Sequence, residues 1–180
     1  MLWLALILPL AAAAPLSPRQ SAGNCYLTGF HTFTLAAINT TLPNANITGA
    51  PLTLAESAHG AQDFYLVTVA TYPVTTSPNT SLAITNGSIT AQSTALTSAT
   101  PGSFLQFTAN APVDPVPGFC GILVPGNGYP LLAINGRTDL FSICSDGQFD
   151  AVVYNATEGS AAYDVGTCYG VTLNMVATAT

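Results

Sequence analysis

Few side chains in this 180-residue sequence could carry out acid, base or metal chemistry. The only two histidines are His31 and His59. A metal site would need both of them and a carboxylate, and neither helical nor strand spacing brings such a set together. We therefore expect each histidine to be half-exposed or hydrogen-bonded, and we expect no metal site and no cofactor.

Asp146 and Asp150 are the pair of acids whose spacing could support catalysis. They stand four residues apart, across an expected turn and into a strand. Paired carboxylates about 5–10 Å apart can hydrolyse glycosidic bonds. Asp146, however, stands directly before Gly147, and aspartate is also favoured at this position by the backbone of a turn. A secreted glycoside hydrolase that uses Asp146 and Asp150 is therefore the least favoured of three functional hypotheses.

Other catalytic motifs are absent from the sequence. There is no Gly-x-Ser-x-Gly nucleophile elbow, no Asp-Thr-Gly or Asp-Ser-Gly, and no glycine-rich phosphate loop after a strand. Arg137, beside Asp139, is the sole strong base of the expected folded region and reads as an exposed turn residue in a weak ion pair. The sequence predicts no catalytic residues, so the chain is expected not to be an enzyme.

The charge balance excludes two classes of partner. Lysine and arginine together number 2, and the formal net charge is -6. Binding to nucleic acid or to an anionic membrane surface needs clustered basic side chains. We expect neither partner.

Tyrosines are the remaining candidates for a binding role. Those in or near the C-terminal strands could stack on sugar rings, although core packing is the favoured role for such residues. The candidate sugar-contact residues are Tyr129, Tyr154, Tyr163 and Tyr169.

The first residues indicate secretion. Residues 2–10 form an unbroken apolar run that is followed by four alanines, which is typical of a signal peptide and too short for a membrane span. We expect a signal peptide at 1–14, a flexible leader at 15–24 and one β domain at 25–176, in an extracellular or cell-wall location.

Five Asn-x-Ser/Thr patterns predict N-glycosylation of an exported chain. The acceptor residues are Asn39, Asn46, Asn79, Asn86 and Asn155.

The cysteines predict two disulfides, because an exported chain with an even number of cysteines tends to pair them. No Cys-x-x-Cys spacing supports zinc binding or dithiol chemistry. Spacing leaves all three pairings open. The residues are Cys25, Cys120, Cys144 and Cys168.

Short apolar or alternating runs separated by turn residues predict an all-β fold. The expected strands are 30–38, 64–72, 81–85, 88–92, 103–108, 119–124, 129–134, 138–144, 148–154 and 168–176, with one helical turn within 51–60. Asn or Asp followed by Gly at 86, 127, 135 and 146 favours two-residue hairpins and hence an antiparallel meander. We expect a single antiparallel β domain, either a trefoil-like barrel or a sandwich.

The C-terminal half resembles a known family. Phe119-Cys120-Gly121-Ile122, Phe141-Ser142-Ile143-Cys144 and the closing run from Thr167 to Leu173 are similar to fungal secreted proteins of the PhiA cell wall protein group. The tryptophan of the family's aromatic strand is absent, and Phe149 and Tyr154 stand near its aromatic positions.

The resemblance implies a non-catalytic cell-wall or extracellular glycoprotein, and this is the leading hypothesis. It also implies pairing Cys144 with Cys168 and Cys25 with Cys120, with the nested pairing as the alternative. The second functional hypothesis is a lectin-like carbohydrate-binding module, for which a cell-wall polysaccharide would be the partner.

Overall fold

The computed structural model describes residues 25–57, 62–72, 81–110 and 114–178. The signal peptide and leader predicted for residues 1–24 lie outside this part of the chain, as do His59 and Asn79. In the part that is described, all regular elements are β-strands, and no helix is long and apolar enough to cross a membrane. The all-β prediction is therefore confirmed.

Thirteen strands occur in the described residues. They are β1 (Phe30–Asn39), β2 (Ala50–Glu56), β3 (Asp63–Thr68), β4 (Leu82–Thr85), β5 (Ser88–Ala91), β6 (Thr94–Ser98), β7 (Ser103–Phe104), β8 (Gln106–Ala109), β9 (Phe119–Ile122), β10 (Leu131–Ile134), β11 (Phe141–Ser145), β12 (Asp150–Tyr154) and β13 (Asp164–Ala177).

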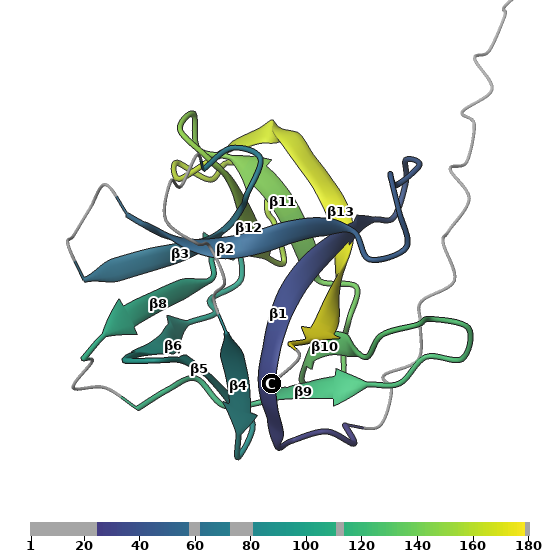
Figure 1. Cartoon of the computed structure of the whole chain (residues 1–180). Coiled ribbons are helices and arrows are strands. Elements are labelled where there is room, and N and C mark those ends of the chain that lie inside the picture. Colours follow the sequence, from purple (N-terminus) through teal and green to yellow (C-terminus); the bar gives the residue numbers. More distant parts are fainter. Residues whose placement is uncertain (1–24, 58–61, 73–80, 111–113, 179–180) are drawn as a thin grey trace, which may run out of the picture.

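The strands close into an antiparallel barrel, as Figure 1 shows. Nine of them form the ring, in the order β1-β4-β5-β6-β8-β3-β12-β11-β13, and β13 pairs back onto β1. β2 pairs with both β1 and β3 and so lies across the ring. β10 and β9 continue from β13, and β7 pairs with β12. The structure thus has a closed barrel with extra strands.

Two of the predicted hairpin turns have the expected geometry. Asn86 and Gly87 join β4 to β5 with φ of 50° and 77°, and Asn135 and Gly136 have φ of 51° and 75°. Positive φ at both central residues matches the twist of paired strands, and Asn and Gly adopt it at low cost. The first turn makes the expected β4–β5 hairpin. The second reverses the chain at the Ile134–Arg137 bridge, but β11, the strand that follows, pairs with β12 and β13 and not with β10.

The other two turn predictions are wrong. Ser145 pairs with Asp150, so the loop around Asp146 and Gly147 has four residues instead of two, and Asp146 does not have positive φ. Asn127 and Gly128 fall within the longer loop between Ile122 and Leu131, which pair with one another. In both places side-chain hydrogen bonds, described below, hold the loop instead of a tight turn.

The helical turn expected within 51–60 is also wrong for the part that the structure describes. Residues 50–56 form β2, and Leu52 to Glu56 pair with five residues of β3. Leu52, Thr53 and Ala55 are buried. Burial against β3 and the core therefore outweighed the local helical preference of this short segment.

The core is built almost entirely from apolar side chains, which come from the inner faces of the ring strands and from β2, β9 and β10. Its largest fully buried members come from strands distant in sequence and are Phe33, Phe107, Phe119 and Phe141. Side chains of alternate strand residues point to the same face, which is why Phe33, Leu35 and Ala37 of β1 enter the core together. Burial of these rings supplies the main stabilisation of the barrel.

Asn174 of β13 is a fully buried polar residue beside this core. Its Nδ2 donates to the carbonyl oxygens of Ile47 at 3.2 Å and Thr48 at 2.9 Å. Its Oδ1 accepts from Nδ2 of Asn127 at 3.1 Å, and the Asn127 amide also donates to the Tyr129 carbonyl at 2.6 Å. The Asn174 carboxamide therefore ties the β1–β2 loop and the β9–β10 loop to β13.

Two disulfides staple the barrel, in the pairing that the family resemblance implies. Cys25 is bonded to Cys120 of β9, and Cys144 of β11 is bonded to Cys168 of β13. The first closes a separation of 95 residues and the second one of 24. Two disulfides are consistent with an oxidising, extracellular compartment.

We predict that Asn174→Ala strongly destabilises the fold. The change leaves two carbonyl oxygens and the Asn127 amide without their buried partner, which should lower the free energy of unfolding by about 3 kcal/mol. The control is Thr172→Ala on the same strand, which is half-buried and should cost less than about 1 kcal/mol. Urea denaturation of both variants checks this, and equal losses would contradict the role given to Asn174.

We predict that the two disulfides contribute unequally to stability. Chain-entropy arguments make a crosslink more stabilising when it closes a longer loop. Replacing Cys25 and Cys120 together by alanine should therefore cost about 1 kcal/mol more than replacing Cys144 and Cys168 together. Denaturant midpoints of the two double variants measure the difference, and the reverse order would refute the expectation.

Candidate functional site

The two acids proposed for hydrolysis have different structural surroundings. Oδ1 of Asp146 accepts hydrogen bonds from the backbone N–H groups of Gln148 and Phe149, both at 2.7 Å, so this carboxylate holds the β11–β12 loop. Asp150 begins β12, and its backbone N–H donates to Thr71 Oγ1. The residues that line the cavity beside Asp146 do not include Asp150. The geometry therefore gives Asp146 a structural role and does not favour the hydrolase hypothesis.

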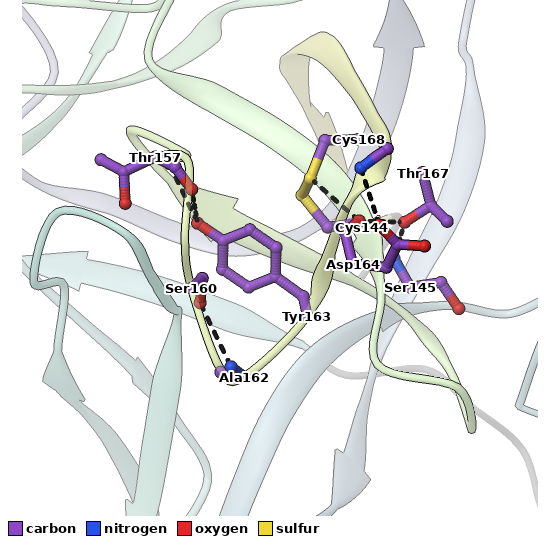
Figure 2. Close-up of a disulfide and its surroundings, with 10 residues drawn as sticks. Cys144, Ser145, Thr157, Ser160, Ala162, Tyr163, Asp164, Thr167 and Cys168 are labelled. Carbon is purple, nitrogen blue, oxygen red and sulfur yellow. Dashed lines mark hydrogen bonds between the residues drawn. A yellow bond between two sulfur atoms is a disulfide. The ribbon is translucent and has the colours of Figure 1, made fainter.

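A cavity of about 390 Å³ lies next to the Cys144–Cys168 disulfide and includes Asp146 and Asp164 in its lining. Three residues of β13, from Val165 to Thr167, bulge out of the ladder there, since Ile143 pairs with Tyr169 but Ser145 pairs with Asp164. Figure 2 shows how local bonds fill this bulge: Thr167 Oγ1 donates to the Asp164 carbonyl and accepts from the Ser145 N–H. The polar groups around this cavity are thus largely used to hold the bulge.

The four candidate sugar-contact tyrosines lie in different surroundings. The Tyr163 ring is buried against Phe104, and its hydroxyl is hydrogen-bonded to the Thr157 backbone (Figure 2). Tyr154 is half-buried, with its ring centre 6.2 Å from that of Phe141. Tyr129 contacts Thr48 Oγ1 through its hydroxyl at 3.1 Å. Tyr163 and Tyr154 therefore pack with the core, which is the role that the sequence favoured for these tyrosines.

Tyr169, the fourth, lines a groove at the end of β1. We call it the Tyr169 groove. It has a volume of about 330 Å³ and is lined by Ala37, Asn39, Pro43, Asn44, Ala45, Asn46, Gly49, Ala50, Pro51, Ile143 and Tyr169. The β1–β2 loop, residues 40–49, forms one wall, and Ile143 of β11 and Tyr169 of β13 form the other. None of these lining residues carries a charge.

Strand pairing explains why the groove reaches the core-facing side of the barrel. Asn39 pairs with Val171, and Ile143 pairs with Tyr169. Paired residues, and residues two apart on one strand, share a face, so all four side chains lie on the same side of the wall. Val171 and Ile143 are buried in the core, and Asn39 is the last residue of β1. The groove is therefore an opening above the core.

The loop over the groove is held by asparagine side chains. Asn39 Oδ1 accepts from the N–H of Thr41 at 2.8 Å, the Thr41 hydroxyl at 3.0 Å and the N–H of Leu42 at 2.9 Å. Asn44 Oδ1 accepts from the Asn39 N–H at 2.8 Å, and its Nδ2 donates to the Asn39 carbonyl at 2.9 Å. These bonds fix the loop without any apolar core of its own, so the groove is preformed in this chain.

The environment of the groove changes the acidity of its tyrosine. Burial raises the pKa of the Tyr169 phenol above its ordinary value, and the negative charge of Asp150 raises it further. The phenol therefore stays neutral and able to donate a hydrogen bond over a wider pH range than a free tyrosine.

Four of the five predicted glycosylation sites fall on described residues. Asn46, Asn86 and Asn155 are exposed, and Asn39 is half-buried. Asn86 and Asn155 stand at positive φ in turns after β4 and β12. Asn39 and Asn46 both line the Tyr169 groove. The sequons lie at strand ends and in loops, outside the main core cluster.

The remaining candidates add no further site. Arg137 forms a bidentate pair with Asp139, both contacts at 2.8 Å, and this pair lowers the pKa of Asp139. His31 lies in β1, but its side chain is not described. Within the described residues no group of three or more His, Cys, Asp or Glu side chains could hold a metal ion.

Sequence reasoning missed Asn174 and the groove residues of the β1–β2 loop. The sequence did contain a signal for Asn174. A single carboxamide among the apolar residues of β13 indicates a buried polar group, which must find hydrogen-bond partners. Pro43, Asn44 and Ala45 gave none, since they read as ordinary loop residues.

Comparisons of the chain with protein-family models, with curated proteins and with solved structures find no match. The resemblance of the C-terminal strands to the PhiA group therefore stays a prediction.

We predict that Tyr169 ionises above the ordinary tyrosine pKa of 10.0. A raised pKa in the folded state means that the stabilisation is complete below pH 10 and is lost as the pH rises through the folded-state value. The wild type should therefore lose stability relative to Tyr169→Phe in strongly alkaline solution. Ultraviolet titration of the phenolate, wild type minus Tyr169→Phe, measures the pKa, and a transition below 10 would contradict the burial.

Proposed function

We propose that this chain is a non-catalytic, secreted glycoprotein of the extracellular space or cell wall. The observation that carries the proposal is the placement of the sequons: three of the four described acceptors are exposed, and all four lie at strand ends or in loops of a disulfide-stapled barrel. Glycans at such positions would coat the barrel without disturbing its core. The leader and the two disulfides support the same compartment.

The sugars would also account for a surface with few charges. Charged residues make up 6% of the chain, and mean hydropathy is +0.45, so ionised side chains supply little of its hydration. Surfaces that stay dispersed in water normally carry many more charges of both signs. Attached glycans supply the hydration that charged residues supply elsewhere.

A lectin-like binding module is the second candidate, and the Tyr169 groove favours it. Small-molecule sites are concave, largely preformed, and combine apolar surface with a few polar groups, and barrel openings are common places for them. The groove has this composition, with a tyrosine, prolines and asparagine amides. The hydrolase hypothesis has no such support, because Asp150 does not line the cavity beside Asp146.

The proposal predicts that the full chain, expressed with its leader in a filamentous fungal host, accumulates in the culture fluid or is released from walls by mild extraction. Digestion with peptide N-glycosidase should lower its apparent mass in steps, one for each occupied sequon. Purely intracellular or unglycosylated material would overturn the proposal. Retention on chitin or β-glucan of the deglycosylated protein, lost in Tyr169→Ala, would favour the second candidate instead.

A further inference from the structure

We propose that the Tyr169 groove binds the chain's own N-linked glycan, which is attached at Asn46. The inference rests on the proposed secreted glycoprotein, and it names the occupant of the groove. Three independent features carry it: the chemistry of the Asn46 amide, the contrast between Asn46 and Asn39, and the neutral lining of the groove.

The Asn46 side chain is arranged for attachment. Its Oδ1 accepts from the N–H groups of Thr48 at 3.0 Å and Gly49 at 2.9 Å, which fixes the carboxamide plane. No hydrogen bond joins its Nδ2 to another described residue, and the residue is exposed. The nitrogen that receives the sugar is thus free at the rim of the groove.

The attachment step is a substitution at the first carbon of the sugar. The donor is a lipid-linked glycosyl diphosphate of the secretory pathway. The bond from Nδ2 to the sugar carbon forms, the bond from that carbon to the diphosphate oxygen breaks, and one amide proton leaves with the diphosphate. No electrons are gained or lost, and no group of this chain is consumed except the N–H.

Asn39 is a poorer carrier for a glycan in the same groove. It is half-buried, and its side chain faces the same side of the wall as the buried Val171. Its Oδ1 takes three hydrogen bonds that hold the β1–β2 loop. A sugar on its Nδ2 would start inside a space of about 330 Å³ and would have to leave under that loop. Asn46, at the exposed side, lets the glycan enter from the rim.

The lining of the groove suits a neutral saccharide. The carbon–hydrogen face of a pyranose packs on flat apolar surfaces, and the half-buried Tyr169 ring with Pro43 and Pro51 provides them. No charged side chain lines the groove, so a neutral ligand loses no ionic hydration there. The volume is at the lower end of the range for small-molecule sites, which suits a short stretch of sugar.

Exposed apolar residues of the same loop point to the same occupant. Ile47, next to Asn46, is 80% exposed, and Leu42 is 63% exposed. A glycan that leaves Asn46 and lies along the β1–β2 loop would cover apolar surface that the barrel itself leaves open.

The test compares the rates at which an endoglycosidase releases the glycans at different sequons of the native, full-length secreted protein. Glycopeptide mass spectrometry measures the rate at each site. If the groove holds the Asn46 glycan about nine-tenths of the time, only about one-tenth is open to an endoglycosidase, so release at Asn46 should be roughly tenfold slower than at Asn155. Denaturation and reduction should abolish the difference. Tyr169→Ala should raise the Asn46 rate towards that of Asn155, whereas Tyr169→Phe, which keeps a ring, should not.

Further outcomes separate this inference from the function on which it rests. A bare Asn46 with glycans at other sequons, or release at Asn46 as fast as at Asn155, overturns the inference and leaves the secreted glycoprotein standing. A chain without any glycan overturns both. Should Tyr169→Ala fail to fold, nuclear magnetic resonance of the wild type decides: upfield-shifted sugar protons support stacking on Tyr169, and unshifted ones refute it.

Discussion

Seven residue pairs between β1 and β13 join the first strand of the barrel to the last, from Phe33 with Ala177 to Asn39 with Val171. The entropic cost of closing such a long loop grows only slowly with its length, while the strands that it brings together bury a common core. β13 also pairs with β11 and β10, so its position fixes the C-terminal third of the molecule. Both the Asn174 hydrogen-bond network and the Tyr169 groove lie along this one strand.

Neutral polar groups, more than charges, hold the loops of this protein. A carboxamide donates and accepts at once, so Asn174 is satisfied at full burial by three hydrogen bonds, where an ionised group would need a buried counter-charge. The sequence has eight acids and only two strong bases, and Arg137 is already paired with Asp139. Asparagine and threonine side chains therefore form the hydrogen bonds that hold loops to strands, a role that ion pairs share in more charged proteins.

Local patterns predicted much of the fold, and long-range contacts decided the rest. β-branched and aromatic runs indicated most strands, and Asn86-Gly87 and Asn135-Gly136 indicated their turns, because these signals act over a few residues. The segment of β2 was misread because its residue types alone do not show that it pairs with β3, which begins at Asp63. The Tyr169 groove was beyond reach for the same reason, since β1, the β1–β2 loop, β11 and β13 meet only after closure. Closure alone does not distinguish a trefoil from other barrels, so the trefoil-like form stays a prediction.

The bond between Cys25 and Cys120 has a consequence apart from stability. β9 pairs with β10 along one side, and on the other side Leu27 bridges Gly121 through two backbone hydrogen bonds. Cys120 is next to Gly121 and Cys25 is two residues before Leu27, so the disulfide holds the bridged segment in place. An uncovered strand as apolar as Phe119–Ile122 would be a template for pairing with another molecule. The crosslink thus acts as an edge cap that protects the barrel from strand-to-strand aggregation.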